Sequence, residues 1–72
     1  MNRYERPNQG GEARVRYLDG DFQVLGPGSF VRCAVTGVEI PLDELKYWSV
    51  KRQEAYVDAT ASLIRFRETG EL

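Results

Sequence analysis

Hydrophobic and polar residues begin to alternate along the chain shortly after residue 12. Val15 and Tyr17 fall on one side of an extended segment, and Arg14 and Arg16 fall on the other. A period of two residues is typical of a strand with one buried face. The segment therefore predicts a strand whose arginines face the solvent.

The dipeptide Asp19-Gly20 predicts a β-hairpin after this strand. Glycine accepts a positive φ without steric cost and aspartate tolerates one, so the pair suits a two-residue hairpin loop. The run 26–29 then turns the chain, and a further strand begins at Phe30. The predicted register of the hairpin pairs Leu18 with Asp21, Tyr17 with Phe22, Arg16 with Gln23 and Val15 with Val24.

A second hairpin is predicted around Thr36-Gly37, in the stretch that also holds the only cysteine of the chain. In this hairpin, apolar residues are expected to pair with apolar residues across the two strands. The sulfur of Cys33 is then expected to point toward the core. A two-residue loop pairs Val35 with Val38, Ala34 with Glu39 and Cys33 with Ile40.

The segment after Trp48 has two interpretations. Ser49 could cap a helix that runs through Arg67, or residues 46–50 could form a fifth strand, followed by a turn and a helix that begins at Asp58. We favour the second, because Asp58 is a good N-cap and Gly70 is a suitable stop. The helix is expected to place its apolar side against the sheet, a side formed by Ala59, Leu63 and Phe66 with Ile64 beside them.

These elements predict an α+β fold, a small antiparallel β-meander of about four to five strands with one C-terminal helix. Residues 12–69 are expected to form a single compact domain. A flexible N-terminal arm, residues 1–11, precedes it, and a tail, residues 70–72, follows it. A chain of 72 residues has a small core, and Cys33 has no second cysteine to pair with, so aromatic residues have to supply much of the packing.

Charge and composition narrow the class of partner. The net charge is −1, and acidic and basic residues are spread over both halves of the chain, so no charged tail points to nucleic acid or to a membrane surface. No run approaches the ~20 apolar residues of a membrane span. The first residues are polar where a signal peptide is apolar, and a lone thiol suits a reducing compartment, so a cytoplasmic location is expected.

Catalysis is not indicated by the residue types present. The chain has no histidine, and Cys33 has no neighbouring base in the pattern that would activate it. Asp43 and Glu44 are interpreted as solvated turn residues rather than a catalytic carboxylate pair. The glycines of the run 26–29 lack the lysine and the helix that follow in a phosphate-binding loop. We expect no enzymatic activity, no catalytic residue and no cofactor.

Several short motifs recur together in one known family. The run RYLDGDFQVLGPGSFVRCAVTGVEIPLDELKYWSVKRQEAY holds an LDGDF hairpin, a C-x-x-T-G turn, an I-P-L-x-x-L segment and a YWSV-x-RQEAY run. It resembles a small family of short bacterial proteins known only as a domain of unknown function. The resemblance covers more than half of the chain. It implies a compact bacterial domain and no particular activity.

The turn from Cys33 to Gly37 also resembles the C-x-x-C-G knuckle of zinc ribbons, with Thr36 where the second thiolate would lie. A structural zinc site needs four nitrogen or sulfur ligands, whereas this chain has one cysteine and no histidine. We therefore expect a zinc-ribbon-like scaffold that is metal-free.

Our leading hypothesis is a non-catalytic interaction module that binds a protein partner. The aromatic residues are numerous for so short a chain, and Trp, Tyr and Arg make effective anchors at interfaces. The candidate interaction surface consists of Tyr47, Trp48, Arg52 and Tyr56. The competing interpretation makes Trp48 the centre of the protein's own core. The sequence does not decide between a monomer and a weak dimer, because an unpaired outer strand could drive dimerisation.

The alternative hypothesis is binding of single-stranded nucleic acid, above all RNA. Arg14, Arg16 and Arg32 are candidates for one arginine-bearing sheet face, and eight of the ten basic residues are arginine. Arginine contacts phosphate through two hydrogen bonds and stacks on bases. Against this, solvent-facing strand positions are commonly charged, and Asp19, Asp21 and Glu39 lie near in the pattern.

Overall fold

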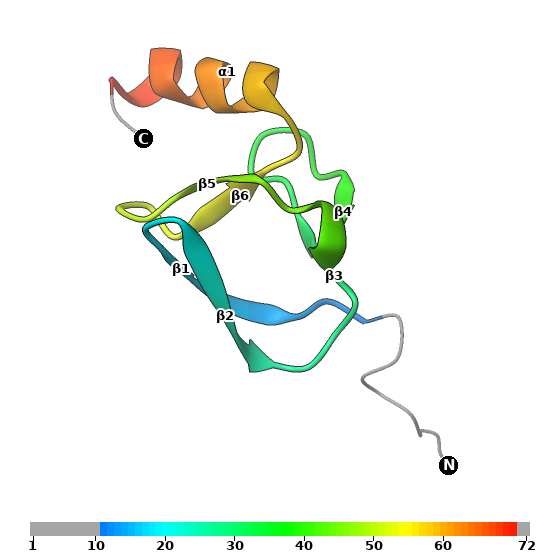
Figure 1. Cartoon of the computed structure of the whole chain (residues 1–72). Helices are drawn as coiled ribbons and strands as arrows, with labels where there is room; N and C mark the ends of the chain where they lie inside the picture. Colours follow the sequence, from blue (N-terminus) through cyan, green and yellow to red (C-terminus); the bar gives the residue numbers. More distant parts are fainter. Residues whose placement is uncertain (1–10, 71–72) are drawn as a thin grey trace.

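The computed structural model describes residues 11–70, which form three β-hairpins and a C-terminal helix (Figure 1). Each hairpin is a separate two-stranded antiparallel sheet. The predicted α+β class is confirmed, with six short strands among the described residues. The elements are β1 (Arg14–Leu18), β2 (Asp21–Gly26), β3 (Phe30–Arg32), β4 (Glu39–Pro41), the 3-10 turn η1 (Leu42–Glu44), β5 (Tyr47–Ser49), β6 (Glu54–Tyr56) and α1 (Ala59–Thr69).

The two ends of the predicted domain are only partly described. Of the predicted N-terminal arm, residues 1–10 lie outside the described residues, and so do residues 71–72 of the predicted tail. Gly11 is described, and its carbonyl accepts a hydrogen bond of 2.9 Å from the Ser29 N–H. Within residues 11–70, no helix has the length and apolar character needed to cross a membrane.

The register predicted for the first hairpin is confirmed at all four pairs, from Leu18 opposite Asp21 to Val15 opposite Val24. Gly20 has a φ of 76°, as a two-residue loop of this kind requires. Gly28, in the turn after β2, has a different role. A Cβ atom there would lie 2.4 Å from the Ala13 backbone nitrogen, so glycine permits the close approach of these two segments.

The register predicted for the second hairpin is wrong by two residues. Val31, not Cys33, lies opposite Ile40. The chain turns over four residues, and the Gly37 N–H donates to the Cys33 carbonyl at 2.9 Å. The sulfur of Cys33 accepts a 3.4 Å hydrogen bond from the Thr36 N–H, and this local bond favours the wider turn. A shift of two residues preserves the faces, so Cys33 still points inward and is 3% exposed.

The favoured interpretation of the C-terminal segment is confirmed. Strand β5 lies within residues 46–50, and it pairs with β6, which was not predicted as a strand. Asp58 caps α1, because its carboxylate accepts a 2.8 Å hydrogen bond from the Ala61 N–H. Gly70, with a φ of 80°, ends the helix in the left-handed region.

The predicted orientation of the helix is wrong. Ala61 is the residue of α1 that is buried, at 1% exposed, whereas Leu63 and Phe66 are 49% and 45% exposed. Arg65, which lies one turn after Ala61, is held by Glu54 of β6. This pairing sets the rotation of α1, so the apolar side that we expected against the sheet faces away from it.

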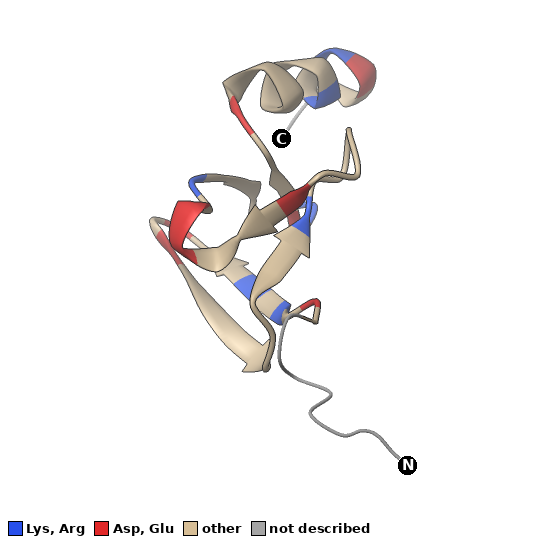
Figure 2. Cartoon of the chain, turned by 90° about the vertical axis from the view of Figure 1, so that its right-hand side faces the viewer, with Lys and Arg blue, Asp and Glu red and all other residues tan. Residues whose placement is uncertain are grey.

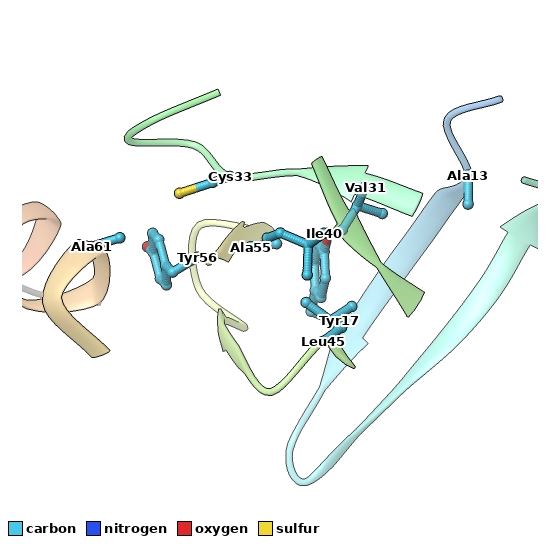
Figure 3. Packing of buried hydrophobic residues seen from close by; sticks show 9 residues of the cluster. All are labelled: Ala13, Tyr17, Val31, Cys33, Ile40, Leu45, Ala55, Tyr56 and Ala61. Atoms are coloured by element: carbon cyan, nitrogen blue, oxygen red, sulfur yellow. The ribbon is translucent and has the colours of Figure 1, made fainter. Parts of the chain in front are cut away.

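The core runs as a row from the helix to the first hairpin (Figure 3). Tyr56, 1% exposed, lies between Ala61 of the helix and Ala55 of β6 (Figure 3) and is the largest fully buried side chain among the described residues. Ala13 and Tyr17 bring the first hairpin into the same row. The buried apolar residues are Ala13, Tyr17, Val31, Cys33, Ile40, Leu45, Ala55, Tyr56 and Ala61.

Candidate interaction surface

The structure separates the four residues predicted to form an interaction surface. Tyr47 and Arg52 are exposed, and Trp48 is half-buried. Tyr56 is buried, and its hydroxyl donates to a Glu54 carboxylate oxygen at 3.0 Å. Burial raises the pKa of the Tyr56 hydroxyl, and the hydrogen bond to Glu54 raises it further. Tyr56 is therefore a core residue and is not part of the surface.

Trp48 joins the third hairpin to the first. Its ring contacts Phe22 edge to face, with centroids 5.7 Å apart, and lies 6.1 Å from the ring of Tyr17. Its indole N–H donates to the Leu18 carbonyl at 2.8 Å. The remaining exposed part of the ring lines a surface hollow. The competing interpretation of Trp48 as a packing residue thus agrees with most of its contacts.

Gln53 makes a second connection between the same two hairpins, which no sequence pattern predicted. Its side-chain oxygen accepts from the Tyr17 N–H at 2.9 Å, and its side-chain nitrogen donates to the Tyr17 carbonyl at 2.8 Å and to the Val50 carbonyl at 2.7 Å. The amide therefore pairs with β1 as a neighbouring strand would. Gln53 also has a positive φ of 54°, an uncommon conformation for a residue with a side chain.

The surface beside Trp48 is hollowed where the turns of the first and third hairpins meet. We call this region the strand hollow. Leu18, Tyr47 and Val50 present exposed apolar side chains to it. Its full lining is Leu18, Asp19, Gly20, Lys46, Tyr47, Trp48, Val50 and Ser62.

A second depression, which we call the helix groove, lies on α1. It is lined by Ala59, Ser62, Leu63 and Phe66, and is almost entirely apolar. Ser62 lines both depressions, so the helix groove and the strand hollow adjoin at this residue. Nine large apolar residues are exposed within residues 11–70, and five of them line these two depressions. An exposed apolar patch of this kind is typical of an interaction surface.

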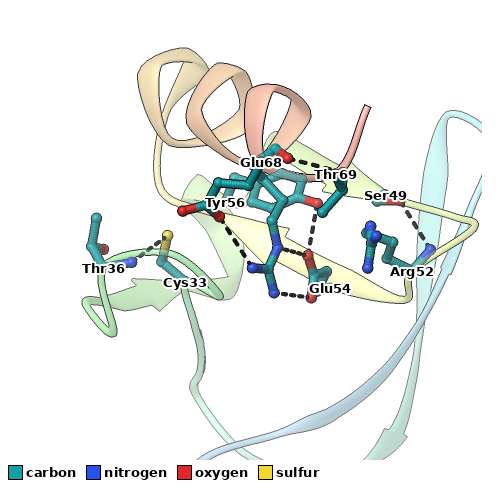
Figure 4. A network of polar contacts seen from close by, with 9 residues as sticks. Cys33, Thr36, Ser49, Arg52, Glu54, Tyr56, Glu68 and Thr69 are labelled. Atoms are coloured by element: carbon teal, nitrogen blue, oxygen red, sulfur yellow. Dashed lines mark hydrogen bonds and ion pairs between the residues drawn. The ribbon is translucent and has the colours of Figure 1, made fainter. Parts of the chain in front are cut away.

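An ion pair joins α1 to β6, and its hydrogen bonds to Glu54 are drawn in Figure 4. The guanidinium of Arg65 donates to both carboxylate oxygens of Glu54, at 2.7 and 3.1 Å. The hydrogen bonds from Arg65 are the main reason why the pKa of the Glu54 carboxyl is lowered. The same bonds raise the pKa of Arg65. The ion pair between Arg65 and Glu54 is bidentate, so it fixes the orientation of the guanidinium relative to the carboxylate as well as their distance.

The three arginines of the nucleic-acid hypothesis are only partly brought together. Arg14 and Arg32 line one hollow, whereas Arg16 is not among its lining residues. Arg32 is already engaged by two carboxylates, at 3.3 Å from Glu39 and 3.8 Å from Glu12. Basic and acidic positions are interspersed along the chain in Figure 2. A phosphate approaching Arg32 would have to compete with these acids.

In the turn at Cys33 the Thr36 N–H points at the sulfur, 3.4 Å away (Figure 4). Burial alone would raise the pKa of the Cys33 thiol, but hydrogen bonds from Thr36 and from the backbone at Val57 and Val35 lower it, and the net pKa is lower than usual. Among residues 11–70 no group of three or more Cys, Asp or Glu is placed to hold a metal ion. The Cys33 side chain itself is part of the buried core.

Comparison with known proteins identifies a family but no function. No curated protein and no solved structure matches the chain. A family model described as "Uncharacterized protein conserved in bacteria (DUF2093)" matches residues 24–65, which is more than half of the 72 residues. The chain therefore belongs to this bacterial family.

Proposed function

We propose that the protein is a non-catalytic interaction module that binds a protein partner through the strand hollow and the helix groove. The observation that carries this proposal is that the two depressions, which hold most of the exposed large apolar residues within residues 11–70, adjoin at Ser62. Tyr47 and Val50 would be the anchors on the strand side, and Leu63 and Phe66 those on the helix side. Large apolar anchors surrounded by polar groups are the usual source of binding energy at interfaces.

Binding of single-stranded nucleic acid is the second candidate. Arg14 and Arg16 are exposed on β1, which leaves them available for phosphate. Because Arg32 is held by acids, the arginine face offers fewer free cations than the hypothesis needs. We therefore place the protein partner first. A cytoplasmic location is part of the proposal, and it rests on the unpaired Cys33 thiol.

The proposal is tested by comparing two matched substitutions in a capture experiment. Val50 and Val24 are similarly exposed, at 41% and 48%, but only Val50 lines the strand hollow. Tagged wild type, Val50→Asp and Val24→Asp are expressed in the native bacterium, and co-purifying proteins are identified by mass spectrometry. Circular dichroism first establishes that both variants are folded.

We expect one partner to be retained by the wild type and by Val24→Asp and to be lost with Val50→Asp, because the substitution removes an apolar anchor and adds a charge that a bound partner would desolvate. Retention of the same partner by Val50→Asp would contradict the proposal. A parallel arm with nuclease treatment, together with a mobility-shift assay on single-stranded RNA at about 50 mM salt, tests the second candidate. Salt-sensitive RNA binding without a protein partner would reverse our ranking.

A further inference from the structure

Helix α1 turns its more apolar side away from the rest of the protein. Ala61 and Arg65 face inward, one turn apart. Each residue advances the helix by about 100°, so Leu63 lies on nearly the opposite side from both. Ala59 and Phe66 lie within about 60° of Leu63 on the same side, and Ser62 lies at its edge. Among the described residues nothing covers this side of the helix.

The residues of the helix groove are arranged so that the groove complements itself. Ala59 and Ser62, the small residues, lie toward the start of α1, and Leu63 and Phe66, the large ones, lie toward its end. Positions 59 and 66 are equidistant from the midpoint between residues 62 and 63, and so are positions 62 and 63 themselves. A two-fold dimer requires a patch that complements its own copy in this way.

We propose that the helix groove takes a second copy of this chain, with the two α1 helices packed antiparallel about a two-fold axis between Ser62 and Leu63. Each Phe66 then lies over Ala59 of the other copy, and each Leu63 over Ser62. Large residues thus meet small ones along the whole contact, as close packing requires. This inference rests on the proposed function, and it assigns a second copy of the chain as the partner that occupies the helix groove.

Charge favours the antiparallel direction. Asp58 and Arg67 are also equidistant from the midpoint between residues 62 and 63, so each Arg67 lies level with Asp58 of the other copy. A parallel pair would place like charges level with each other and align the two helix dipoles. Both side chains are exposed, so the charges select the direction and contribute little to the affinity.

The size of the contact predicts a weak dimer. A helix of 11 residues is about 16 Å long, and its exposed side alone falls short of the roughly 1,200 Å² that a stable interface buries. We expect rapid exchange between monomer and dimer, with a dissociation constant on the order of tens of micromolar.

The test exchanges the large and small members of one pair. Sedimentation equilibrium is measured over a wide concentration range for the wild type, Phe66→Ala, Ala59→Phe and the double variant. Both positions are exposed, so each variant is expected to fold, and circular dichroism verifies this. Leu25→Ala, at an exposed apolar position on β2 outside the groove, is the matched control.

We expect each single substitution to weaken self-association by about tenfold, because one leaves a gap and the other brings two phenylalanines into collision. The double variant restores large-on-small packing and should recover most of the loss, and Leu25→Ala should associate as the wild type does. A wild type that stays monomeric at about 1 mM, an equal loss with Leu25→Ala, or a double variant weaker than both singles would overturn the inference. Partner capture with Val50→Asp is independent of these outcomes, so failure of the dimer and failure of the proposed function are distinguishable.

Discussion

Replacing Trp48 by alanine tests whether this ring holds the two hairpins together. The substitution removes the 2.8 Å hydrogen bond from the indole N–H to the Leu18 carbonyl and the ring contacts with Phe22 and Tyr17. A hydrogen bond contributes about 1 kcal/mol. Each aromatic pair contributes about 0.5–1.5 kcal/mol beyond the buried area. Together these losses come to about 3 kcal/mol.

This loss is large for so small a domain. At roughly 0.05–0.15 kcal/mol per residue, a chain of 72 residues has a free energy of unfolding of about 4–11 kcal/mol. Trp48→Phe keeps most of the ring contacts and removes the hydrogen bond, so it should cost only about 1 kcal/mol. The difference between the two variants measures the ring contacts.

The assay is guanidinium denaturation followed by far-ultraviolet circular dichroism, because the variants lack the only tryptophan and cannot be followed by its fluorescence. A double-mutant cycle with Phe22→Leu isolates the edge-to-face contact, for which we expect a coupling of about 0.5–1.5 kcal/mol. If Trp48→Ala changed the free energy of unfolding by less than about 0.5 kcal/mol, the ring would not be a packing residue, and its contacts in the structure would carry no stability.

Three further predictions concern the polar contacts. Gln53→Ala should cost about 1–2 kcal/mol in denaturation experiments through loss of the hydrogen bonds to Tyr17, and Gln53→Gly should cost less because glycine accepts the positive φ without strain. The pKa of Glu54 is lower in the folded than in the unfolded protein, so its contribution to stability is complete above the ordinary glutamate pKa and is lost as the pH falls through the folded value. Acid titration of the free energy of unfolding should show this loss, and Glu54→Gln, which cannot titrate, should lack it. Cys33 should react with a thiol reagent at least about 100-fold more slowly in the native than in the unfolded protein because it is buried, and fast native labelling would contradict its placement.

Local signals predicted the parts of the fold that depend on neighbouring residues. Asp19-Gly20 determines the register of the first hairpin through its own backbone preferences, and Asp58 and Gly70 determine the two ends of α1. In each case the deciding contact spans a few residues of chain. The alternation of apolar and polar residues around Tyr17 was likewise sufficient to predict that this ring faces the core.

The features that the sequence did not predict, the rotation of α1 and the connection between the first and third hairpins, depend on contacts between residues far apart in the chain. The rotation of α1 depends on Glu54, 11 residues before Arg65, and apolar periodicity alone favoured the opposite side. The connection from Gln53 to Tyr17 spans 36 residues and uses a side-chain amide in place of a strand. Of the residues proposed for the interaction surface, Tyr47 is exposed and lines the strand hollow, whereas Leu63 and Phe66, which line the helix groove, were predicted to face the sheet.

The three hairpins share no continuous backbone ladder, and within residues 11–70 the isolated bridges from Glu12 to Phe30 and from Cys33 to Ala55 are the only β-bridges besides those within the hairpins. Each hairpin closes over a short loop, and hairpins of this kind form in about 1–10 μs. We therefore expect stopped-flow or temperature-jump folding kinetics to show fast formation of the separate hairpins, followed by a slower step in which the side chains of the three hairpins pack against one another. Substitutions at the docking contacts should retard this second step and leave the first unchanged.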